Sequence, residues 1–174
     1  MLEQRLKENI AEVPDFPKPG ISFKDITPVL LNPTLSHEVV QAFTQQAIKL
    51  KADYVAGIDA RGFLFGLAVA QELGIGFIPV RKRGKLPRAS VEESYQLEYG
   101  QAAVAVHQED VPKKARILIH DDLLATGGTA NAAQKLFQKL GAQVCGFQFL
   151  IELDFLKGAL DLNHKEILSL CHYS

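Results

Sequence analysis

Apolar residues in the first fifty positions recur at the spacing of amphipathic helices. A short first helix is predicted from four residues that lie three or four positions apart: Leu2, Leu6, Ile10 and Val13. A second helix is expected after Asn32, whose side chain can cap it while Pro33 takes the first helical position. Its apolar face consists of Val39, Val40, Phe43, Ala47 and Leu50.

After residue 51, short apolar strands alternate with helical patterns, and this alternation occurs twice. Both units have the order strand, helix, strand: residues 54–58, 63–72 and 77–80, then residues 116–120, 129–140 and 143–151. Strands that alternate with helices are joined by right-handed crossovers into a mainly parallel sheet with helices on both faces. The pattern therefore predicts an α/β fold, with residues 1–174 forming a single domain.

The segment between the two predicted N-terminal helices departs from this alternation. Residues 13–28 hold four prolines and a glycine, which exclude a helix or a central strand. A linker would be polar, but this segment also carries four large apolar residues: Phe16, Ile21, Phe23 and Ile26. Residues 1–33 are therefore expected to form a helix and an ordered arm that packs on the body.

Residues 81–106 form a second departure, between the two strand-helix units. The segment opens with a basic run and then alternates apolar with polar residues, the apolar ones being Val91, Tyr95, Leu97, Tyr99, Val104 and Val106. Gly100 separates the two alternating stretches. This pattern is typical of two antiparallel strands. We expect a basic loop followed by a flap beside the main sheet.

Composition and charge narrow the classes of function. Lys and Arg number 19 against 20 Asp and Glu, so the formal net charge is −1, which argues against a nucleic-acid-binding protein with a broad basic face. No run of eighteen apolar residues predicts a membrane span, and the first residues lack a signal peptide, so a cytoplasmic location is expected. Cys145 and Cys171 are interpreted as buried thiols rather than as a disulfide or metal ligands.

The most informative stretch is residues 117–129, where an apolar strand ends in Asp121 and Asp122 and a turn of small residues opens a helix. The turn consists of Ala125, Thr126, Gly127, Gly128 and Thr129. Its backbone N–H groups can wrap an anion at the helix N-terminus without a lysine. Two acids beside a phosphate would suit the hydroxyls of a ribose. The combination predicts a ribose 5-phosphate site, and the alternative is a capped turn with solvated acids.

Six segments together resemble the type I phosphoribosyltransferases, in particular the members that act on adenine. They are residues 14–17, 20–28, 61–66, 81–87, 94–100 and 121–129. The resemblance covers nearly the whole chain. It implies transfer of the phosphoribosyl group from phosphoribosyl diphosphate to adenine, with release of pyrophosphate and formation of AMP in purine salvage. It also implies Mg²⁺ as cofactor and a homodimer whose neighbouring subunit contributes near the basic loop.

The resemblance assigns the phosphoribosyl diphosphate site to three parts of the chain. Asp121 and Asp122 would hold the ribose hydroxyls, and Ala125, Thr126, Gly127, Gly128 and Thr129 would hold the 5-phosphate. Arg61, Lys82 and Lys85 would meet the pyrophosphate, and the turn at Arg61 often carries an unusual peptide bond in the family. No direct protein ligand to Mg²⁺ is expected, because the diphosphate, the ribose hydroxyls and water would hold it.

The resemblance places adenine on the arm. Phe23 would stack on the purine, while the backbone of Ser22 and Lys24 would bind its edge. Glu98, on the flap, would manage the proton of the attacking base, and it forms the expected catalytic pair with Arg61. For each side chain a purely structural role is the alternative: an anchor for Phe23, a solvated acid for Glu98 and a surface ion pair for Arg61.

Four positions depart from the family pattern: His120, Arg88, and Ser22 and Lys24, which stand where valine and arginine are commoner. Two other functions also stay open. His120 stands where an apolar residue is usual and is expected to be packed or at the subunit boundary, while the role of Arg88 is undefined. The motif at residues 121–129 fits the same transfer to another base, such as hypoxanthine, guanine, xanthine or orotate. It also fits a regulator that binds phosphoribosyl diphosphate without turnover, although such regulators usually carry a nucleic-acid-binding domain.

Overall fold

The computed structural model describes residues 1–97 and 100–174 of the chain. Within these residues, one seven-stranded sheet has the order β5-β6-β4-β3-β7-β8-β9. Its parallel part consists of β3 (Tyr54–Ile58), β4 (Gly76–Lys82), β7 (Arg116–Leu124), β8 (Gln143–Leu153) and β9 (Ile167–Tyr173). The mainly parallel sheet confirms the predicted α/β fold.

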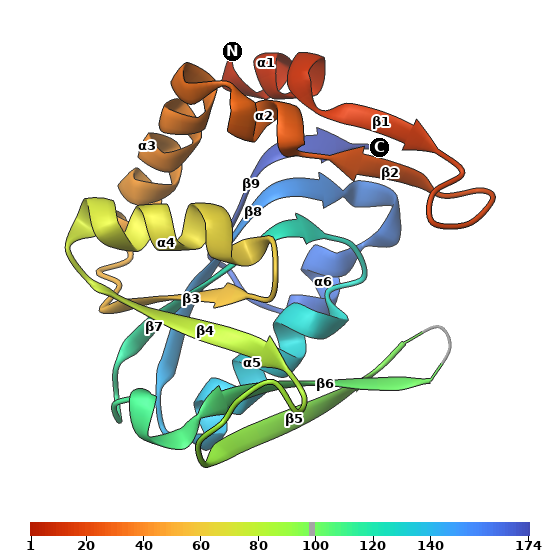
Figure 1. Cartoon of the computed structure of the whole chain (residues 1–174). Coiled ribbons are helices and arrows are strands. Elements are labelled where there is room, and N and C mark those ends of the chain that lie inside the picture. Colours follow the sequence, from red (N-terminus) through yellow and green to blue (C-terminus); the bar gives the residue numbers. More distant parts are fainter. Residues whose placement is uncertain (98–99) are drawn as a thin grey trace.

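Helices cover both faces of this sheet, with α3 (Pro33–Lys49) and α4 (Gly62–Leu73) on one and α5 (Gly128–Lys139) on the other (Figure 1). The alternation of side chains along β7 explains the two cores. Leu118 packs in the cluster of α3 and α4, whereas Ile117 and Ile119 pack in the cluster of α5. The predicted cap of α3 is confirmed, because the backbone N–H of Leu35 donates to Asn32 Oδ1 over 3.1 Å.

The N-terminal region differs from its prediction in one respect. Helix α1 (Leu2–Asn9) ends before Val13, which lies 39% exposed in β1 (Ala11–Pro14) and pairs with Phe23 of β2 (Ser22–Asp25). The pairing of β1 with β2 explains the early end, since Ile10 already has extended backbone. A short α2 (Thr27–Leu31) then leads to α3. The arm packs at its base, where Ile26 is buried, but its tip is open, with Phe16 51% exposed.

The flap consists of β5 (Ser90–Gln96) and β6 (Gln101–His107), which pair antiparallel as predicted. It continues the main sheet rather than lying beside it, because β6 also pairs with the end of β4 at Arg81 and Lys82. Of the predicted alternating residues, Leu97 follows the end of β5, and Tyr99 lies outside the described residues. Figure 1 shows that the flap and the arm project from the same side of the molecule.

Three short elements complete the chain. They are the 3₁₀ helices η1 (Gln108–Asp110) and η2 (Asp154–Leu156) and the helix α6 (Gly158–Leu162), which contacts α5. Among the helices of the described residues, none has both the length and the apolar character that crossing a bilayer requires.

Candidate active site

A cavity of about 450 Å³ opens at the carboxyl ends of β3, β4 and β7, between the flap and the start of α5. This is the edge at which parallel α/β sheets bind ligands. The residues predicted to bind a phosphorylated sugar meet there from separate parts of the chain: Arg61, Lys82, Asp121, Asp122, Ala125, Thr126, Gly127, Gly128 and Thr129. Tyr95 of the flap also lines the cavity and was not among the predicted residues.

The two acids at the end of β7 have unusual electrostatics. Asp122 is 5% exposed, and Arg61 Nε lies 2.7 Å from its Oδ2. Burial raises the pKa of Asp121 well above the usual carboxyl range, and the neighbouring charge of Asp122 raises it further. Burial also raises the pKa of Asp122, although Arg61 opposes that shift. The raised pKa values mean that the protein does not fully stabilise the charges of the two carboxylates. Hydroxyl groups of a ligand can supply the missing hydrogen bonds.

The turn that follows has the backbone form of an anion nest. Gly127 precedes α5 with φ +83°, in the left-handed region that favours glycine, and Gly128 is the first residue of the helix. The first helical hydrogen bond runs from the Asn131 N–H to the Gly127 carbonyl over 2.8 Å. The N–H groups at the start of α5 and the positive end of its dipole therefore face the cavity without intrahelical acceptors.

Sequence reasoning did not identify Gly158, the first residue of α6, although it supports this turn directly. A Cβ atom on Gly158 would lie 2.2 Å from the carbonyl oxygen of Ala125 and 3.0 Å from the backbone nitrogen of Gly127. A Cβ atom on Gly127 would in turn lie 2.7 Å from the Gly158 carbonyl oxygen. The two backbones touch with no space for a side chain. The only signal in the sequence is a glycine at the start of a short helical pattern after β8.

The turn after β3 brings Arg61 to the cavity. The Asp59–Ala60 peptide bond in this turn is cis, and Arg61 is the residue that directly precedes α4. Asp59 is held by Arg81, whose Nε donates to its Oδ2 over 2.9 Å. Neither Asp59 nor Arg81 was predicted as a site residue, because their pairing joins β3 to β4 and has no local signal.

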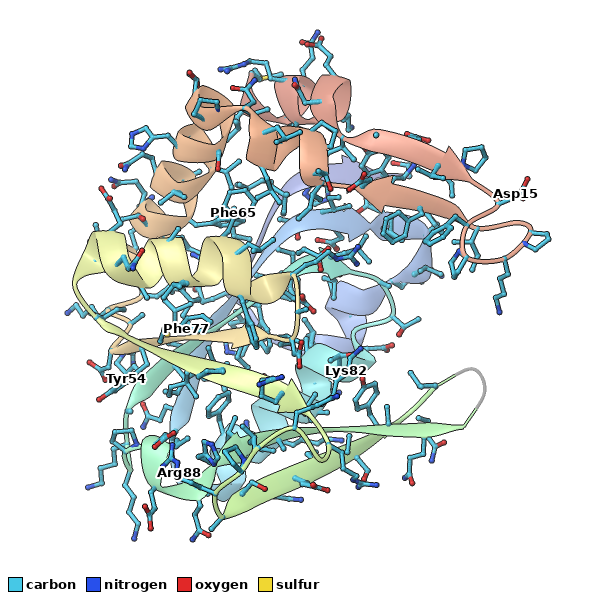
Figure 2. The ribbon with its side chains drawn as sticks, viewed as in Figure 1. Asp15, Tyr54, Phe65, Phe77, Lys82 and Arg88 are labelled. Carbon is cyan, nitrogen blue, oxygen red and sulfur yellow. The ribbon has the colours of Figure 1, made fainter. Side chains whose placement is uncertain are left out.

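The basic residues of the loop after β4 separate into two groups. Arg83 pairs with Glu92 and Arg88 with Asp110, which gives Arg88 a structural partner in the flap region. No carboxylate among residues 1–97 and 100–174 lies within 4.0 Å of the ammonium groups of Lys82 or Lys85. Lys82, at the end of β4, lines the cavity (Figure 2), whereas Lys85 lies exposed in the following turn, outside its lining.

The predicted base-binding residues lie on β2, near the cavity but outside its lining. The ring of Phe23 is partly buried, 5.2 Å from the ring of Phe16, and the guanidinium carbon of Arg61 lies 5.0 Å from the Phe23 centroid. Ser22 is exposed, whereas the side chain of Lys24 is buried. Glu98 lies outside the described residues.

His120 is packed in the core, the first of the two alternatives predicted for it. It is fully buried with its ring 4.9 Å from the ring of Phe43. Burial lowers its pKa to about 3, so the imidazole is neutral at physiological pH. It faces away from Asp121 because neighbouring residues on a strand point to opposite faces.

One group of possible metal ligands lies elsewhere in the described part of the chain. Glu152, Asp154 and His172 bring one ligand atom each within 4.8 Å of one another. These atoms already have partners, since His172 Nδ1 lies 3.0 Å from Asp154 Oδ1 and Ser169 donates to Glu152. None of the three lines the cavity at the end of β7.

The sequence and the structure of the chain both match known proteins. Residues 34–165 match the family model described as "Phosphoribosyl transferase domain". The chain is 52% identical to the adenine phosphoribosyltransferase of Cytophaga hutchinsonii over 158 residues, 91% of this chain and 87% of that protein. The crystal structure of the adenine phosphoribosyltransferase of Thermoanaerobacter pseudethanolicus superimposes with a TM-score of 0.95 at 44% identity, covering 99% and 100% of the two chains.

A third relative was solved with ligands. The adenine phosphoribosyltransferase of Saccharomyces cerevisiae, complexed with adenine and an imino-altritol bisphosphate, superimposes with a TM-score of 0.92 at 38% identity. The alignment covers 97% of this chain and 98% of the yeast chain.

Proposed function

This chain belongs to the adenine phosphoribosyltransferases of the type I phosphoribosyltransferase family, and from that membership we propose how its residues perform the reaction. The reaction joins adenine to the phosphoribosyl group of phosphoribosyl diphosphate and yields AMP and pyrophosphate, a purine-salvage step. The observation that carries the proposal is a single cavity that combines the paired acids, the anion nest and Arg61, with Phe23 beside Arg61.

The turn at residues 125–129 is proposed to hold the 5-phosphate. Its backbone N–H groups are the donors, and the hydroxyls of Thr126 and Thr129 add to them. Hydrogen bonds to charged groups contribute about 1.5–3 kcal/mol each, so several donors on one phosphate dominate substrate binding. Asp121 and Asp122 accept hydrogen bonds from the two ribose hydroxyls, which places the anomeric carbon on the side of the cavity toward Arg61.

Arg61, Lys82 and Lys85 are proposed to bind the pyrophosphate that leaves. Negative charge gathers on this group as its bond to the ribose breaks, and fixed cations stabilise such charge. In the free protein Asp122 holds Arg61 at the cavity. Lys82 and Lys85 have no carboxylate partner among the described residues, and this supports their assignment to a ligand anion.

The carboxylates of the cavity fit a Mg²⁺ ion that is bound by the substrate rather than directly by the protein. Three carboxylates line the cavity, of which Asp59 is already paired with Arg81 and Asp122 with Arg61. Mg²⁺ commonly keeps several waters and binds substrate phosphates. Asp121 and Asp122 would hold the ion indirectly, through the ribose hydroxyls, with no protein atom as a direct ligand. When bound, Mg²⁺ neutralises charge on the diphosphate and makes it a better leaving group.

Strand β2 is proposed to bind adenine. The Ile21 carbonyl accepts a hydrogen bond from the Phe16 N–H over 3.2 Å, so the backbone groups of Ile21 point toward the β1 side of the arm. Backbone groups of successive strand residues point to alternate edges. The N–H and C=O groups of Ser22 and Lys24 then point to the opposite edge, where a donor and an acceptor can bind the edge of a purine. Phe23 supplies the stacking surface.

Glu98 is proposed to manage the proton of the attacking base nitrogen, acting with Arg61 as the catalytic pair. A carboxyl enclosed with substrate would have a raised pKa, suited to general acid–base work. Wild-type turnover in a Glu98→Gln variant would exclude this role.

We further propose a cytoplasmic homodimer. Leu64 and Leu67 on α4 are 46% and 43% exposed, next to Arg61 along the helix, and apolar residues in such a position suit a subunit interface. A mass of 19.2 kDa in sedimentation equilibrium, the mass of one chain, would contradict the dimer.

The reaction is tested by offering the protein phosphoribosyl diphosphate, Mg²⁺ and one of four bases: adenine, hypoxanthine, guanine or orotate. We expect AMP and pyrophosphate in equal amounts from adenine, little product from the other bases, and loss of turnover when Mg²⁺ is chelated. Product from another base alone would refute the assignment of the arm. Tight binding of phosphoribosyl diphosphate without any product would favour the regulator.

A further inference from the structure

Lys24 has surroundings that its backbone role does not explain. Its side chain is 8% exposed, although lysine is rarely buried without a partner. Its ammonium nitrogen lies 2.8 Å from Glu12 Oε2, 3.3 Å from Ser22 Oγ and 4.2 Å from the centroid of the Tyr173 ring. The first two partners belong to the arm itself. Tyr173 belongs to the last strand of the main sheet, so its contact with Lys24 joins the arm to the body.

The position of Tyr173 is fixed by its contacts with the main sheet and with α1. It lies on β9 opposite Leu153 of β8, and its ring packs against the core beneath α3 and α4. The neighbouring His172 N–H donates to Glu3 Oε1 of α1 over 3.1 Å, and Lys7 of α1 lies 5.7 Å from the Tyr173 ring. The end of β9 is thus held by the sheet on one side and by α1 on the other.

The opposite side of the same strand carries Phe23. Neighbouring residues on a strand point to opposite faces, so a strand held through Lys24 directs Phe23 away from Tyr173. That direction leads to Arg61, whose guanidinium carbon lies 5.0 Å from the Phe23 ring. Elsewhere in the arm, the side chains of Phe16 and Val13 are 51% and 39% exposed.

We infer that the contact of Lys24 with Tyr173 is a positioning device, which holds β2 against the body so that Phe23 and the neighbouring backbone meet the base. The inference rests on the proposed function, because it assumes that β2 binds adenine. A cation over an aromatic face gains most when it is desolvated, and the Lys24 side chain is 8% exposed. Neither side chain touches the substrate. Both act through the placement of the strand between them.

The test compares Lys24→Met and Tyr173→Leu with the matched control Tyr173→Phe. Methionine keeps the length of the side chain without its charge, and leucine removes the ring. Phenylalanine keeps the ring that faces Lys24 and removes the hydroxyl alone. We expect each disrupting variant to raise the KM for adenine about tenfold, with the KM for phosphoribosyl diphosphate changed less than about twofold. Tyr173→Phe is expected to retain the wild-type values.

The double variant separates coupling from two independent effects. If the two side chains act as one device, Lys24→Met combined with Tyr173→Leu raises the KM for adenine no further than either change alone. A product of the single effects, about a hundredfold, would overturn the inference. Equal increases in the KM of both substrates would overturn it as well.

Hydrogen exchange gives a readout that does not depend on activity. Amides of residues 11–25 are expected to exchange faster in Lys24→Met and Tyr173→Leu, while those of β8 are unchanged. Unchanged exchange in residues 11–25 would refute the positioning role even if the wild-type protein made no AMP. Absence of AMP from the wild-type protein would instead refute the proposed function. The two failures are therefore distinguishable.

Discussion

The Gly158→Ala substitution is expected to raise the KM for phosphoribosyl diphosphate about a hundredfold, the effect of losing one or two hydrogen bonds to a charged phosphate. The added Cβ would lie 2.2 Å from the Ala125 carbonyl oxygen and 3.0 Å from the Gly127 nitrogen. Both are backbone atoms, so the collision can be relieved only if the turn at residues 125–129 or the start of α6 moves. Initial rates with varied phosphoribosyl diphosphate measure the effect.

A matched control separates this displacement from the general cost of replacing glycine. Gly141 has a left-handed backbone, with φ +81°, which Gly158 lacks, and a Cβ there would come no closer than 3.8 Å to a neighbour, the Lys113 side chain. Gly141→Ala is expected to lower the melting temperature and leave the KM for phosphoribosyl diphosphate unchanged. A Gly158→Ala variant with the wild-type KM would show that α6 does not support the phosphate site.

Asparagine in place of Asp121 is expected to have two opposite effects, on catalysis and on stability. The value of kcat/KM should fall about a hundredfold, because a charged acceptor for a ribose hydroxyl is replaced by a neutral one. The free protein should become more stable at pH 8, because the variant no longer buries beside Asp122 a carboxyl whose pKa is raised by burial. In the wild type the Asp122 N–H donates to Asp121 Oδ1 over 2.8 Å, and the amide oxygen of the introduced asparagine can still accept this hydrogen bond.

The direction of the pH dependence follows from the raised pKa of Asp121. A carboxyl whose pKa is higher in the folded than in the unfolded state favours folding below its unfolded value and loses that contribution as pH rises through the folded value. The variant should therefore melt above the wild type at pH 8, by about 2–4 °C for each kcal/mol relieved, and the difference should shrink toward pH 4. Thermal melts of both proteins at the two pH values measure it. Equal melting temperatures at pH 8 would contradict the claim that burying Asp121 beside Asp122 destabilises the folded protein.

The sequence allowed the fold to be predicted, and with it the meeting of Arg61 and the stretch at residues 121–129 at one cavity, because both depend on local patterns. Residues 121–129 hold a strand end, two acids and a helix start in nine consecutive positions, so their order along the chain already describes their arrangement. Arg61 could be placed because it follows a strand parallel to β7. The parallel neighbours β3 and β7 then bring Arg61 and Asp122 within 2.7 Å.

The features that were missed depend on contacts between distant residues. Gly158 contacts Ala125, and Lys24 contacts Tyr173. The residues of each pair are far apart in the sequence, so no periodic pattern of residues predicts the contact. The error at Val13 has a similar origin, since pairing with Phe23 draws that residue into a strand and ends the helix early. The prediction for His120 gave two alternatives, because its burial depends on α3, which packs on that face of β7 and supplies Phe43.

The central claim is that the turn at residues 125–129 holds the phosphate and that the arm holds the base. Calorimetric titration of ribose 5-phosphate and AMP into the wild type, Gly128→Val and Phe23→Ala tests it most directly. A Cβ at Gly128 would come no closer than 3.5 Å to protein atoms, so this variant is expected to fold. We predict that Gly128→Val weakens both ligands at least about tenfold, whereas Phe23→Ala weakens AMP alone by about tenfold. Wild-type affinity of Gly128→Val for ribose 5-phosphate would contradict the account.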